Sequence, residues 1–458
     1  MKLNRREFLG RTSVTGVALA CGGSKLATAL AAQTPPNLAA RSLGRPALLG
    51  GQPVRTRPFP GWPVFDATEE RALLEVLRTG KWFRGYGEMV DRFERAYAEL
   101  TGAKYCVATA SGTAALTTSL GALDIGPGDE VILPPFTFIA TYNVVVLNYA
   151  LPVFVDMDVK TFQLDANKLD AAITPRTRAI LPVHLGGAPA DMDKIMEIAN
   201  RHKVPVIEDA CQSHLAEWRG KKVGTLGLAG CFSFQASKNL NSGEGGAILT
   251  NDEAFAEQCY SFHNQGRIRK PGAWKPEYSA SRGSNLRLTE FQAGLLMAQM
   301  TRLEAQARTR ADNGRYLTRA LRAAVPGVVP AEEHEGCTFN AYHLYMARYL
   351  KEHFAGMDKA KFLKAIDAEG IPFRSGYSPM NRDAHVRALL KNRHYRRIYP
   401  PEVLDTWEER NQCPQNDLLC SQAIWFSQNI LLGTHEDMDQ IVEALVKIQK
   451  HAAELAKA

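Results

Sequence analysis

Seven short apolar runs between residues 105 and 250 are the feature that most constrains how this chain can fold. They hold four to seven residues each: YCVATA (105–110), EVILP (130–134), LPVFVD (151–156), RAILPVH (178–184), VPVIED (204–209), CFSF (231–234) and GAILT (246–250). Polar or helical segments separate most of them. Runs that are apolar on both faces and joined by such crossovers predict a mostly parallel sheet covered by helices, an α/β fold. The last two runs are joined too tightly for a parallel crossover, so one of them is expected to run antiparallel.

The sequence around these runs predicts the first part of the domain organisation. Residues 33–65 are rich in Pro, Gly and Arg, which predicts a linker and an N-terminal arm. An amphipathic helix is predicted at 67–80, ended by Gly80, and a long helix at 288–310. Both helices belong to a predicted large domain at 66–310.

The pattern changes in the C-terminal third of the chain. Residues 341–350 alternate between apolar and polar side chains, as a strand of an antiparallel sheet does. A helix ended by Gly370 is predicted at 359–370, and an amphipathic helix at 436–458 closes the chain. We therefore expect a second, smaller α+β domain at 311–458.

The N-terminus has the layout of an export signal. NRREFLG (4–10) holds a twin-arginine pair, TSVTGVALA (12–20) is a short apolar stretch, and ATALAAQ (27–33) is a small-residue cleavage zone. Nine apolar or small residues cannot span a bilayer, so no stable membrane insertion is expected. A Tat-type signal at 1–32 and a periplasmic protein are predicted. The alternatives are a disordered basic start, a misassigned start codon that leaves the protein cytoplasmic, or lipoprotein cleavage at Cys21.

Charge and cysteine usage exclude several functional classes. Nine of the 55 Lys and Arg residues and one of the 48 acidic residues lie in 1–57, so the net charge of +7 comes from the tail, and the remaining 46 basic and 47 acidic residues nearly balance. No nucleic-acid partner is predicted. Of eight cysteines only Cys413 and Cys420 lie close together, and no metal-ligand spacing occurs, so neither a zinc site nor a disulfide framework is expected. Three others are predicted core thiols: Cys106, Cys211 and Cys231.

Two of the apolar runs lead into candidate binding residues. ATASGTAAL (108–116) passes from a strand through Gly112 and Thr113 into a helix. Gly112 allows close backbone approach, and the helix N-terminus offers free N–H groups to an anion. The same pattern is also that of an ordinary capped helix start. In VIEDACQSH (206–214), Glu208 and Asp209 end a buried strand, where Asp209 either caps a following helix or keeps a heteroaromatic nitrogen protonated.

Aromatic residues and a lysine complete the set. PPFTFIAT (134–141) places Phe136 and Phe138 beyond a strand end, where a flat ring could stack, although at least one of them is expected in the core. In CFSFQASKNLNSGEGGAILT (231–250), Ser233 could bind a phosphate and Lys238 follows an apolar run. A desolvated lysine has a lowered pKa and becomes a usable nucleophile. A phosphate cradle, an acid for a ring nitrogen, a stacking aromatic and a Schiff-base lysine together predict a pyridoxal 5'-phosphate (PLP) site.

The ordered motifs also resemble a known family. They are LLGGQPVR, SGTAAL, GPGDEVILPPFTF, PVFVDMD, VHLGGAPADMD, VIEDACQ, CFSFQASKNLNSGEGGAILT and SNLRLTEFQAGLLMAQM. In this order, across roughly residues 45–450, they resemble the DegT/StrS sugar aminotransferases, which are fold-type I PLP enzymes. The resemblance implies an aspartate aminotransferase-like fold with a mostly parallel seven-stranded sheet sandwiched by helices.

The resemblance also implies individual roles. Lys238 falls on the family's internal-aldimine lysine, Asp209 on the acid that pairs with the pyridinium nitrogen, Gln212 on a residue near the ring hydroxyl and Phe138 on the stacking aromatic. Three positions match phosphate contacts: Gly112, Thr113 and Ser233. Asn285 resembles an asparagine that reaches the phosphate of the neighbouring subunit, which implies a homodimer with shared sites. His184, at a strand end, is either a substrate contact or a satisfied core histidine.

The activity implied is amino transfer from glutamate or glutamine to a keto-sugar, nucleotide-linked in much of the family, or to a keto-cyclitol. CFSFQASK and RLTEFQAGLLMAQM favour the branch with aminocyclitol aminotransferases and 3-amino-5-hydroxybenzoate synthase. Family dehydratases carry histidine in place of the lysine, so Lys238 favours amino transfer. The alternatives are a PLP-dependent dehydratase or aromatising enzyme and an exported, non-catalytic binding or sensory module.

Overall fold

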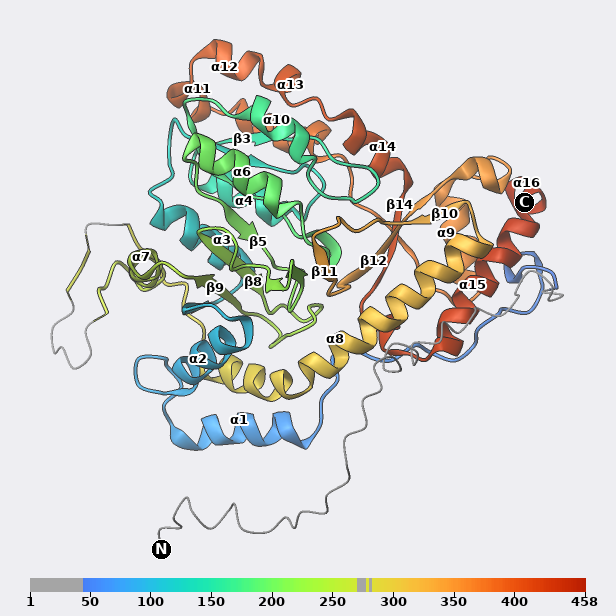
Figure 1. Cartoon of the computed structure of the whole chain (residues 1–458), viewed down its shortest axis with the longest axis horizontal. Helices are drawn as coiled ribbons and strands as arrows, with labels where there is room; N and C mark the ends of the chain where they lie inside the picture. The colour runs from blue at the N-terminus through green and yellow to red at the C-terminus, as the bar shows by residue number, and fades with distance from the viewer. Residues whose placement is uncertain (1–43, 270–276, 280–281) are drawn as a thin grey trace, which may run out of the picture. The chain divides into compact units, whose positions relative to one another are not determined.

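The computed structural model describes residues 44–269, 277–279 and 282–458 (Figure 1). The predicted export signal at 1–32 and the first residues of the predicted arm lie outside the described residues. Within the described part, no helix is both long enough and apolar enough to cross a membrane.

One seven-stranded sheet forms the centre of the first half of the described chain. Its strands are β1 (Tyr105–Thr109), β2 (Glu130–Leu133), β3 (Leu151–Phe154), β4 (Thr177–Ile180), β5 (Ile207–Asp209), β8 (Ala229–Ser233) and β9 (Gly246–Thr250). Two hydrogen-bonded groups, β1-β9-β8-β5 and β3-β2-β4, are joined by parallel bridges between Ile180 and Val206 and between Val183 and Asp209. β9 runs antiparallel to both of its neighbours. All seven predicted strands, and the one antiparallel exception, are confirmed.

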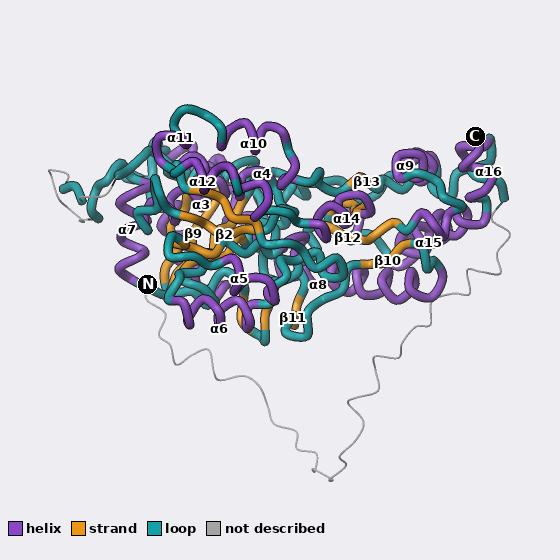
Figure 2. Tube along the Cα trace, turned by 90° about the horizontal axis from the view of Figure 1, so that it is seen from above, coloured by secondary structure: helices purple, strands orange, loops and turns teal. Residues whose placement is uncertain are grey.

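Helices cover both faces of this sheet because its strands are apolar on both sides. Cys106 and Ala108 face one hydrophobic core, while Val107 between them faces another. The first core contains α2 (Met89–Thr101), α6 (Met192–His202) and the start of α8 (Glu290–Ala324); the second contains α3 (Gly112–Ala122), α4 (Ile139–Leu147) and α7 (Glu253–His263). Figure 2 shows the orange strands between α3 and α4 above and α5 (Leu169–Ala172) and α6 below.

An antiparallel sheet organises the C-terminal part. Its order is β10 (Val328–Pro330), β12 (Leu344–Tyr349), β14 (Ala423–Ser427), β13 (Arg374–Ser375), and it packs on α9 (Lys359–Ala368) and α15 (His435–Lys450). The predicted strand and the predicted helix at 359–370 are thus present. The predicted closing helix at 436–458 is wrong in one respect, because the chain turns at His451 and continues as a separate helix, α16 (Ala452–Lys457).

One long helix is shared by the two parts. α8 begins with a capping box between Thr289 and Gln292 and runs for 35 residues, well past the predicted end at 310. Its first half packs against α1 (Ala67–Thr79) and α2, and its second half packs against α15 and β10. A boundary at 310 would therefore fall inside a continuous helix, and the division into domains stays a prediction.

A run of short helices between β13 and β14 returns to the large sheet, which the sequence pattern did not predict. These helices are α10 (Ala384–Leu390), α11 (Tyr395–Ile398), α12 (Pro401–Asp405), α13 (Trp407–Arg410) and α14 (Pro414–Gln422). Trp407 Nε1 donates to the carbonyl of Pro152 over 2.8 Å, and Asn411 Oδ1 accepts from the N–H of Phe154 over 2.6 Å. This segment therefore covers β3, the edge strand of the seven-stranded sheet.

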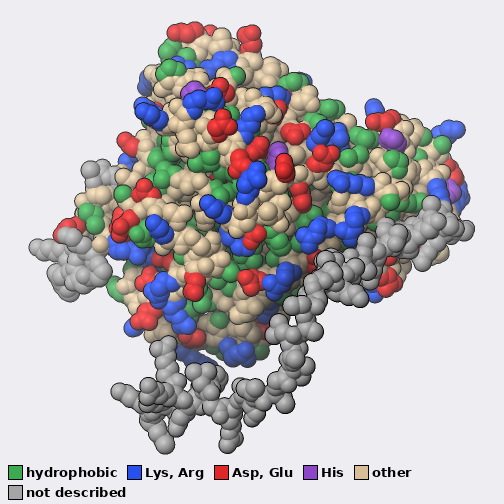
Figure 3. Space-filling view, in the orientation of Figure 1, with side chains coloured by type: hydrophobic (Ala, Val, Ile, Leu, Met, Phe, Trp, Pro, Cys, Tyr) green, Lys and Arg blue, Asp and Glu red, His purple; other side chains and the backbone are tan. Residues whose placement is uncertain are grey.

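A small ribbon and the surface charge complete the description. β6 (Glu217–Trp218), β7 (Lys221–Lys222) and β11 (Cys337–Phe339) form a three-stranded antiparallel sheet. On the face shown in Figure 3, basic and acidic side chains are interspersed over the described surface, without a broad basic area.

Candidate active site

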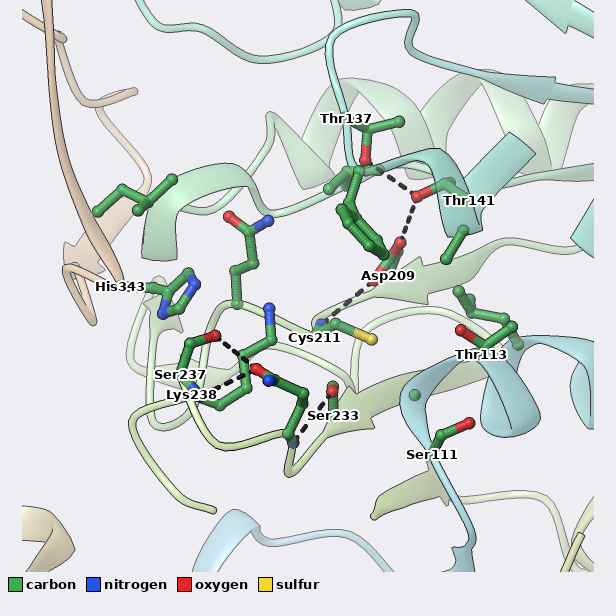
Figure 4. A pocket seen from close by; sticks show the side chains of 18 of the residues that line it. Ser111, Thr113, Thr137, Thr141, Asp209, Cys211, Ser233, Ser237, Lys238 and His343 are labelled. Atoms are coloured by element: carbon green, nitrogen blue, oxygen red, sulfur yellow. Dashed lines mark hydrogen bonds between the residues drawn. The ribbon is translucent and has the colours of Figure 1, made fainter. Parts of the chain in front are cut away.

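A cavity of about 500 Å³ lies at the carboxyl edge of the seven-stranded sheet. Parallel strands bring their carboxyl ends to one edge, so loops that are distant in sequence meet there. Seven predicted residues line this cavity: Gly112, Thr113, Phe138, Asp209, Gln212, Ser233 and Lys238. Figure 4 shows Ser111, Thr113 and Thr141 on one side, Lys238 and His343 on the other, and Asp209 between them with its hydrogen bond to Thr141.

Lys238 lies in the turn that follows β8. Its N–H donates to the carbonyl of Gln235 over 2.8 Å, and the N–H of Ala236 donates to the carbonyl of Gly243 over 2.9 Å, which closes the turn. The side chain is half-buried, and removal of the amine from water lowers the pKa of Lys238 below its usual value. The negative charge of the Asp209 carboxylate acts in the opposite direction. The residue has the features of a nucleophilic amine.

Asp209 ends β5 with its carboxylate fixed by two donors. Thr141 Oγ1 donates to Oδ2 over 2.8 Å, and the N–H of Cys211 donates to Oδ1 over 3.2 Å. Thr137 extends the network through a 2.9 Å contact with Thr141 Oγ1. No helix follows Asp209 directly, so the helix-cap interpretation is wrong. The carboxylate faces the cavity, where it could pair with a protonated ring nitrogen.

Gln212 is held in one amide orientation. Its Oε1 accepts from the N–H of Gly186 over 2.8 Å, and its Nε2 lies 3.4 Å from the hydroxyl of Tyr377, to which it donates. Burial raises the pKa of Tyr377 to about 12, so this hydroxyl stays protonated and can donate in turn. Gln212 thus connects the large-sheet loops to a residue next to β13.

The start of α3 forms an anion-binding corner. Ser111 caps the helix, because its Oγ accepts from the N–H of Ala114 over 3.0 Å. At Gly112 an added Cβ would lie 2.6 Å from Ser233 Cβ and 2.8 Å from Cys211 Sγ, so only glycine permits this approach. The helix N-terminus and the hydroxyls of Thr113 and Ser233 thus face one small volume, as a phosphate group requires.

The structure separates the two candidate aromatics. Phe136 is fully buried and packs against the rings of Tyr377 and Trp425. Phe138 is 58% exposed and lines the cavity at the start of α4. Phe136 is therefore the core residue, and Phe138 is free to stack on a ligand ring.

His184 lies in the core beside the sheet and does not line the cavity. Its Nδ1 accepts from the N–H of Ala190 over 3.1 Å, so Nε2 carries the hydrogen and donates to Glu208 over 2.9 Å. Glu208 also accepts from the N–H groups of Gly224, Leu226 and Gly227 at 2.7–2.8 Å. All polar side-chain atoms of this pair have hydrogen-bond partners. His184 is therefore a core histidine and not a substrate contact.

Asn285 lies away from this chain's cavity. It is exposed and forms a bridge with Asn264, in a strand-like pairing that precedes α8. Its predicted contact is with the phosphate in a neighbouring subunit, and that role stays a prediction.

Several residues at the cavity were not found from sequence. They are Thr137, Thr141, Cys211, His343, Tyr377 and Trp425. Cys211 was predicted to be a core thiol, but it is half-buried at the cavity wall, because its neighbour Gly112 leaves room for the sulfur. The threonines lie in the quoted PPFTFIAT motif and could have been chosen as hydrogen-bond donors to an acid. The other three come from the C-terminal part, where no local pattern points to the cavity.

The fold and the cavity together define a class of enzyme, the PLP-dependent aminotransferases with an aspartate aminotransferase-like fold. Residues 63–446 match the model of the DegT/DnrJ/EryC1/StrS aminotransferase family, and the chain belongs to this family. It is therefore an aminotransferase, and PLP is the expected cofactor.

Relatives with assigned activities include L-glutamine:2-deoxy-scyllo-inosose aminotransferases. The enzyme from Streptomyces lividus is 37% identical over 421 residues, which cover 89% of this chain and 98% of that enzyme. The one from Streptomyces fradiae is 38% identical over 428 residues, which cover 90% and 99%. Among solved structures, 3-amino-5-hydroxybenzoic acid synthase has a TM-score of 0.77 at 33% identity, with 88% of this chain and 100% of that chain covered.

Proposed function

We propose that this protein transfers the amino group of L-glutamine to the ketone of a polyhydroxylated carbocycle, a keto-cyclitol. The convergence of Lys238, Asp209 and the N-terminus of α3 on one cavity is the observation that carries the proposal. The donor and acceptor are those that the names of the relatives from Streptomyces lividus and Streptomyces fradiae state. A cavity of about 500 Å³ has room for a cofactor and a small ring.

The residues at the cavity fit PLP. The α3 N-terminus with Thr113 and Ser233 would hold the phosphate, Asp209 the ring nitrogen, and Lys238 the aldehyde carbon. When bound, PLP supplies an electron-withdrawing ring that stabilises negative charge at the α-carbon of the amino donor. The ring nitrogen would have to stay protonated for this, and the negative charge of the Asp209 carboxylate would favour that protonated form.

The protein's own groups move the protons. The Lys238 amine, with its lowered pKa, would take the α-proton of the amino donor in the first half-reaction. In the second half-reaction it would deliver a proton to the carbon atom that was the ketone carbon of the acceptor. Thr141 keeps the Asp209 carboxylate aligned. Tyr377 and Trp425 close the cavity from the side of the C-terminal part, which reduces access of water to the reacting carbon.

A half-reaction assay tests this function. The PLP-loaded protein is mixed with L-glutamine, and the visible absorbance of the cofactor is followed before and after 2-deoxy-scyllo-inosose is added. We expect glutamine to bleach the band and the keto-cyclitol to restore it, whereas a Lys238→Ala variant shows neither change. Failure of every keto-cyclitol to restore the band, alongside rapid bleaching by glutamine, would reject the acceptor class. Restoration by a nucleotide-linked keto-sugar alone would assign that acceptor instead.

A homodimer with shared sites is part of the proposal. Among the described residues that line the cavity, Lys238 and His343 are the only nitrogen bases, yet the cofactor phosphate and the donor carboxylate are both anions. The exposed Asn285 would contribute to the cavity of a second copy. Mixing equal amounts of Lys238→Ala and Asn285→Ala subunits tests this. Half of the randomly formed dimers would hold one subunit of each kind, and one of the two sites in each such dimer would have both Lys238 and Asn285. A quarter of all sites would therefore be complete. Activity that stays at the sum of the two variants would exclude sharing.

We further propose that residues 1–32 export the folded protein through the Tat system. The twin arginines Arg5 and Arg6 and the uneven charge of the N-terminus support this. An Arg5→Lys, Arg6→Lys variant is expected to stay in the cytoplasm, and fractionation of periplasmic and cytoplasmic protein measures it. Equal periplasmic amounts of both forms would contradict export by this route.

A further inference from the structure

His343 lies at the cavity wall next to Lys238, although the segment around it was predicted only as a strand. It directly precedes β12 and is 6% exposed, while Lys238 belongs to the turn after β8 (Figure 4). The placement and the hydrogen-bonding state of His343 both point to a ligand.

A strained piece of backbone places this histidine. Gly186 and Gly187 adopt left-handed conformations, with φ of 65° and 103°, and an added Cβ on Gly187 would lie 2.5 Å from the backbone nitrogen of Tyr342. The N–H of Ala341 donates to the carbonyl of Gly187 over 2.9 Å, and Tyr342 itself has a φ of 47°. Glycine adopts such conformations without steric cost, but for Tyr342 a positive φ costs energy and persists only where the surroundings require it. The chain is thus forced into the position that presents His343 to the cavity.

The neighbour of Lys238 determines the tautomer. Asn239 Nδ2 donates to the carbonyl of Ala341 over 2.8 Å, so Asn239 Oδ1 is the atom that faces His343 Nδ1 at 3.3 Å. An amide oxygen only accepts, so Nδ1 carries the hydrogen and Nε2 has a free lone pair. Nε2 has no hydrogen-bond partner within the described ranges. It is also not among the unpartnered polar atoms that the protein encloses completely, so it is open to the space beside it. We take it to face the cavity.

The surroundings keep the ring neutral. Burial, and then the positive charge of Lys238, lower the pKa of His343 well below its usual value; His214 and Arg310 act in the same direction. Burial also lowers the pKa of His214 to about 3, so the charged groups that face His343 are Lys238 and Arg310. No acidic group contributes to its pKa, so the surroundings favour the neutral ring over a cation that would bind a carboxylate.

We infer that His343 Nε2 accepts a hydrogen bond from a ring hydroxyl of the keto acceptor and so selects hydroxylated rings. This inference rests on the proposed function and adds a specificity-determining residue to it. A neutral nitrogen with a lone pair repels the carboxylate of an amino acid but matches an O–H donor. The Tyr377 hydroxyl and Gln212 line the same cavity and can pair with further hydroxyls. A site that is built to bind a hydroxyl strongly rejects an analogue without it.

Three variants separate this role from a structural one. His343→Asn keeps a donor toward Asn239 but removes the acceptor at the position of Nε2. His343→Gln places an amide near that position, and His343→Phe removes both polar atoms. His385→Asn, an exposed histidine on α10, is the matched control.

The two half-reactions are measured separately, with 2-deoxy-scyllo-inosose and with cyclohexanone as acceptors, and with glutamine and glutamate as donors. We expect kcat/KM for 2-deoxy-scyllo-inosose to fall about tenfold or more in His343→Asn and His343→Phe, since a lost hydrogen bond of about 1.4 kcal/mol is tenfold. His343→Gln recovers part of the loss. The rates with cyclohexanone and with both donors stay unchanged. Calorimetry with scyllo-inositol, which cannot react, is expected to show the same loss of affinity.

The outcomes that overturn the inference are distinct. Equal losses in both half-reactions, or equal losses with cyclohexanone, would assign a structural role. A loss confined to glutamine, with glutamate unaffected, would place His343 at the carboxamide of the donor. If the wild type uses keto-cyclitols and His343→Asn is unaffected, only this inference fails. If the wild type uses none of them, the proposed function fails first.

Discussion

Thr141 Oγ1 donates a 2.8 Å hydrogen bond to Oδ2 of Asp209, so the cavity acid at the end of β5 is aligned by a side chain from the first turn of α4. We expect Thr141→Val to lower the rate of the glutamine half-reaction by about tenfold to a hundredfold, because a hydrogen bond to a charged group contributes about 1.5–3 kcal/mol. Stopped-flow absorbance measures the rate. Thr137→Val is the control, because it removes a hydroxyl that contacts Thr141 but not Asp209, and it should lower the rate much less. Equal rates for Thr141→Val and the wild type would show that this alignment is dispensable.

Gly112 should be intolerant of even one methyl group. A Cβ there would meet Ser233 and Cys211 at 2.6 and 2.8 Å, so Gly112→Ala must displace the wall that would receive the phosphate. We expect PLP affinity to fall by about tenfold or more, as measured by titration of the apoenzyme, since 1.4 kcal/mol corresponds to tenfold. Gly126→Ala has only ordinary contacts at 4.0 Å and should leave PLP affinity unchanged. Unchanged affinity in Gly112→Ala would argue against this corner as the phosphate site.

The lowered pKa of Lys238 should be visible as a pH dependence of stability. In the apoenzyme the folded-state pKa lies below the 10.5 of an ordinary lysine. Between these two values the unfolded chain binds more protons than the folded chain, so the free energy of unfolding rises with pH across that window. Lys238→Met should lack this component. Urea unfolding of the two apo forms across the window tests it, and parallel pH profiles would contradict the shift.

Glu208 should be required for stability rather than for chemistry. Its four hydrogen-bond donors include His184, whose other nitrogen is already an acceptor for Ala190. In Glu208→Gln the amide NH₂ group would face at least one N–H donor in either orientation of the amide. A change of the His184 tautomer would not relieve this, because Nδ1 would then carry a hydrogen that faces the N–H of Ala190. We expect a loss of about 2–3 kcal/mol in the free energy of unfolding, with kcat of the folded fraction retained.

Denaturant titration alongside an activity assay measures both quantities. Glu304→Gln, an exposed carboxylate on α8, is the matched control and should leave stability unchanged. If Glu208→Gln lost kcat while keeping its stability, Glu208 would instead take part in the reaction.

The predictions from sequence succeeded where the physical signal was local. The seven strands were predictable because a sheet that is covered on both faces needs continuous apolar runs. Asp209, Ser233 and Lys238 were predictable because each lies at or just after the end of such a run, where the edge of an α/β sheet binds ligands.

The missed features depend on contacts between distant parts of the chain. His343 is 105 residues from Lys238, and its presentation depends on the turn at Gly186 and Gly187, which no pattern around His343 reveals. Trp407 begins the short helix α13 and Asn411 directly follows it, and the burial of both depends on β3 rather than on a helical periodicity. The end of α8 was missed because its second half packs on different partners, which changes the apolar face along one helix.

The continuity of α8 bears on fragment complementation. A helix of 35 residues extends about 52 Å, and this one supplies side chains to the cores on both sides of the cavity. If the chain were divided at residue 310 and the two pieces were co-expressed, each piece would end in a part of α8 with an exposed apolar stripe. Such pieces would be prone to aggregate before they reassociate. A split in the exposed turn at Gly356, which follows the whole of α8, would leave that helix intact in the N-terminal piece.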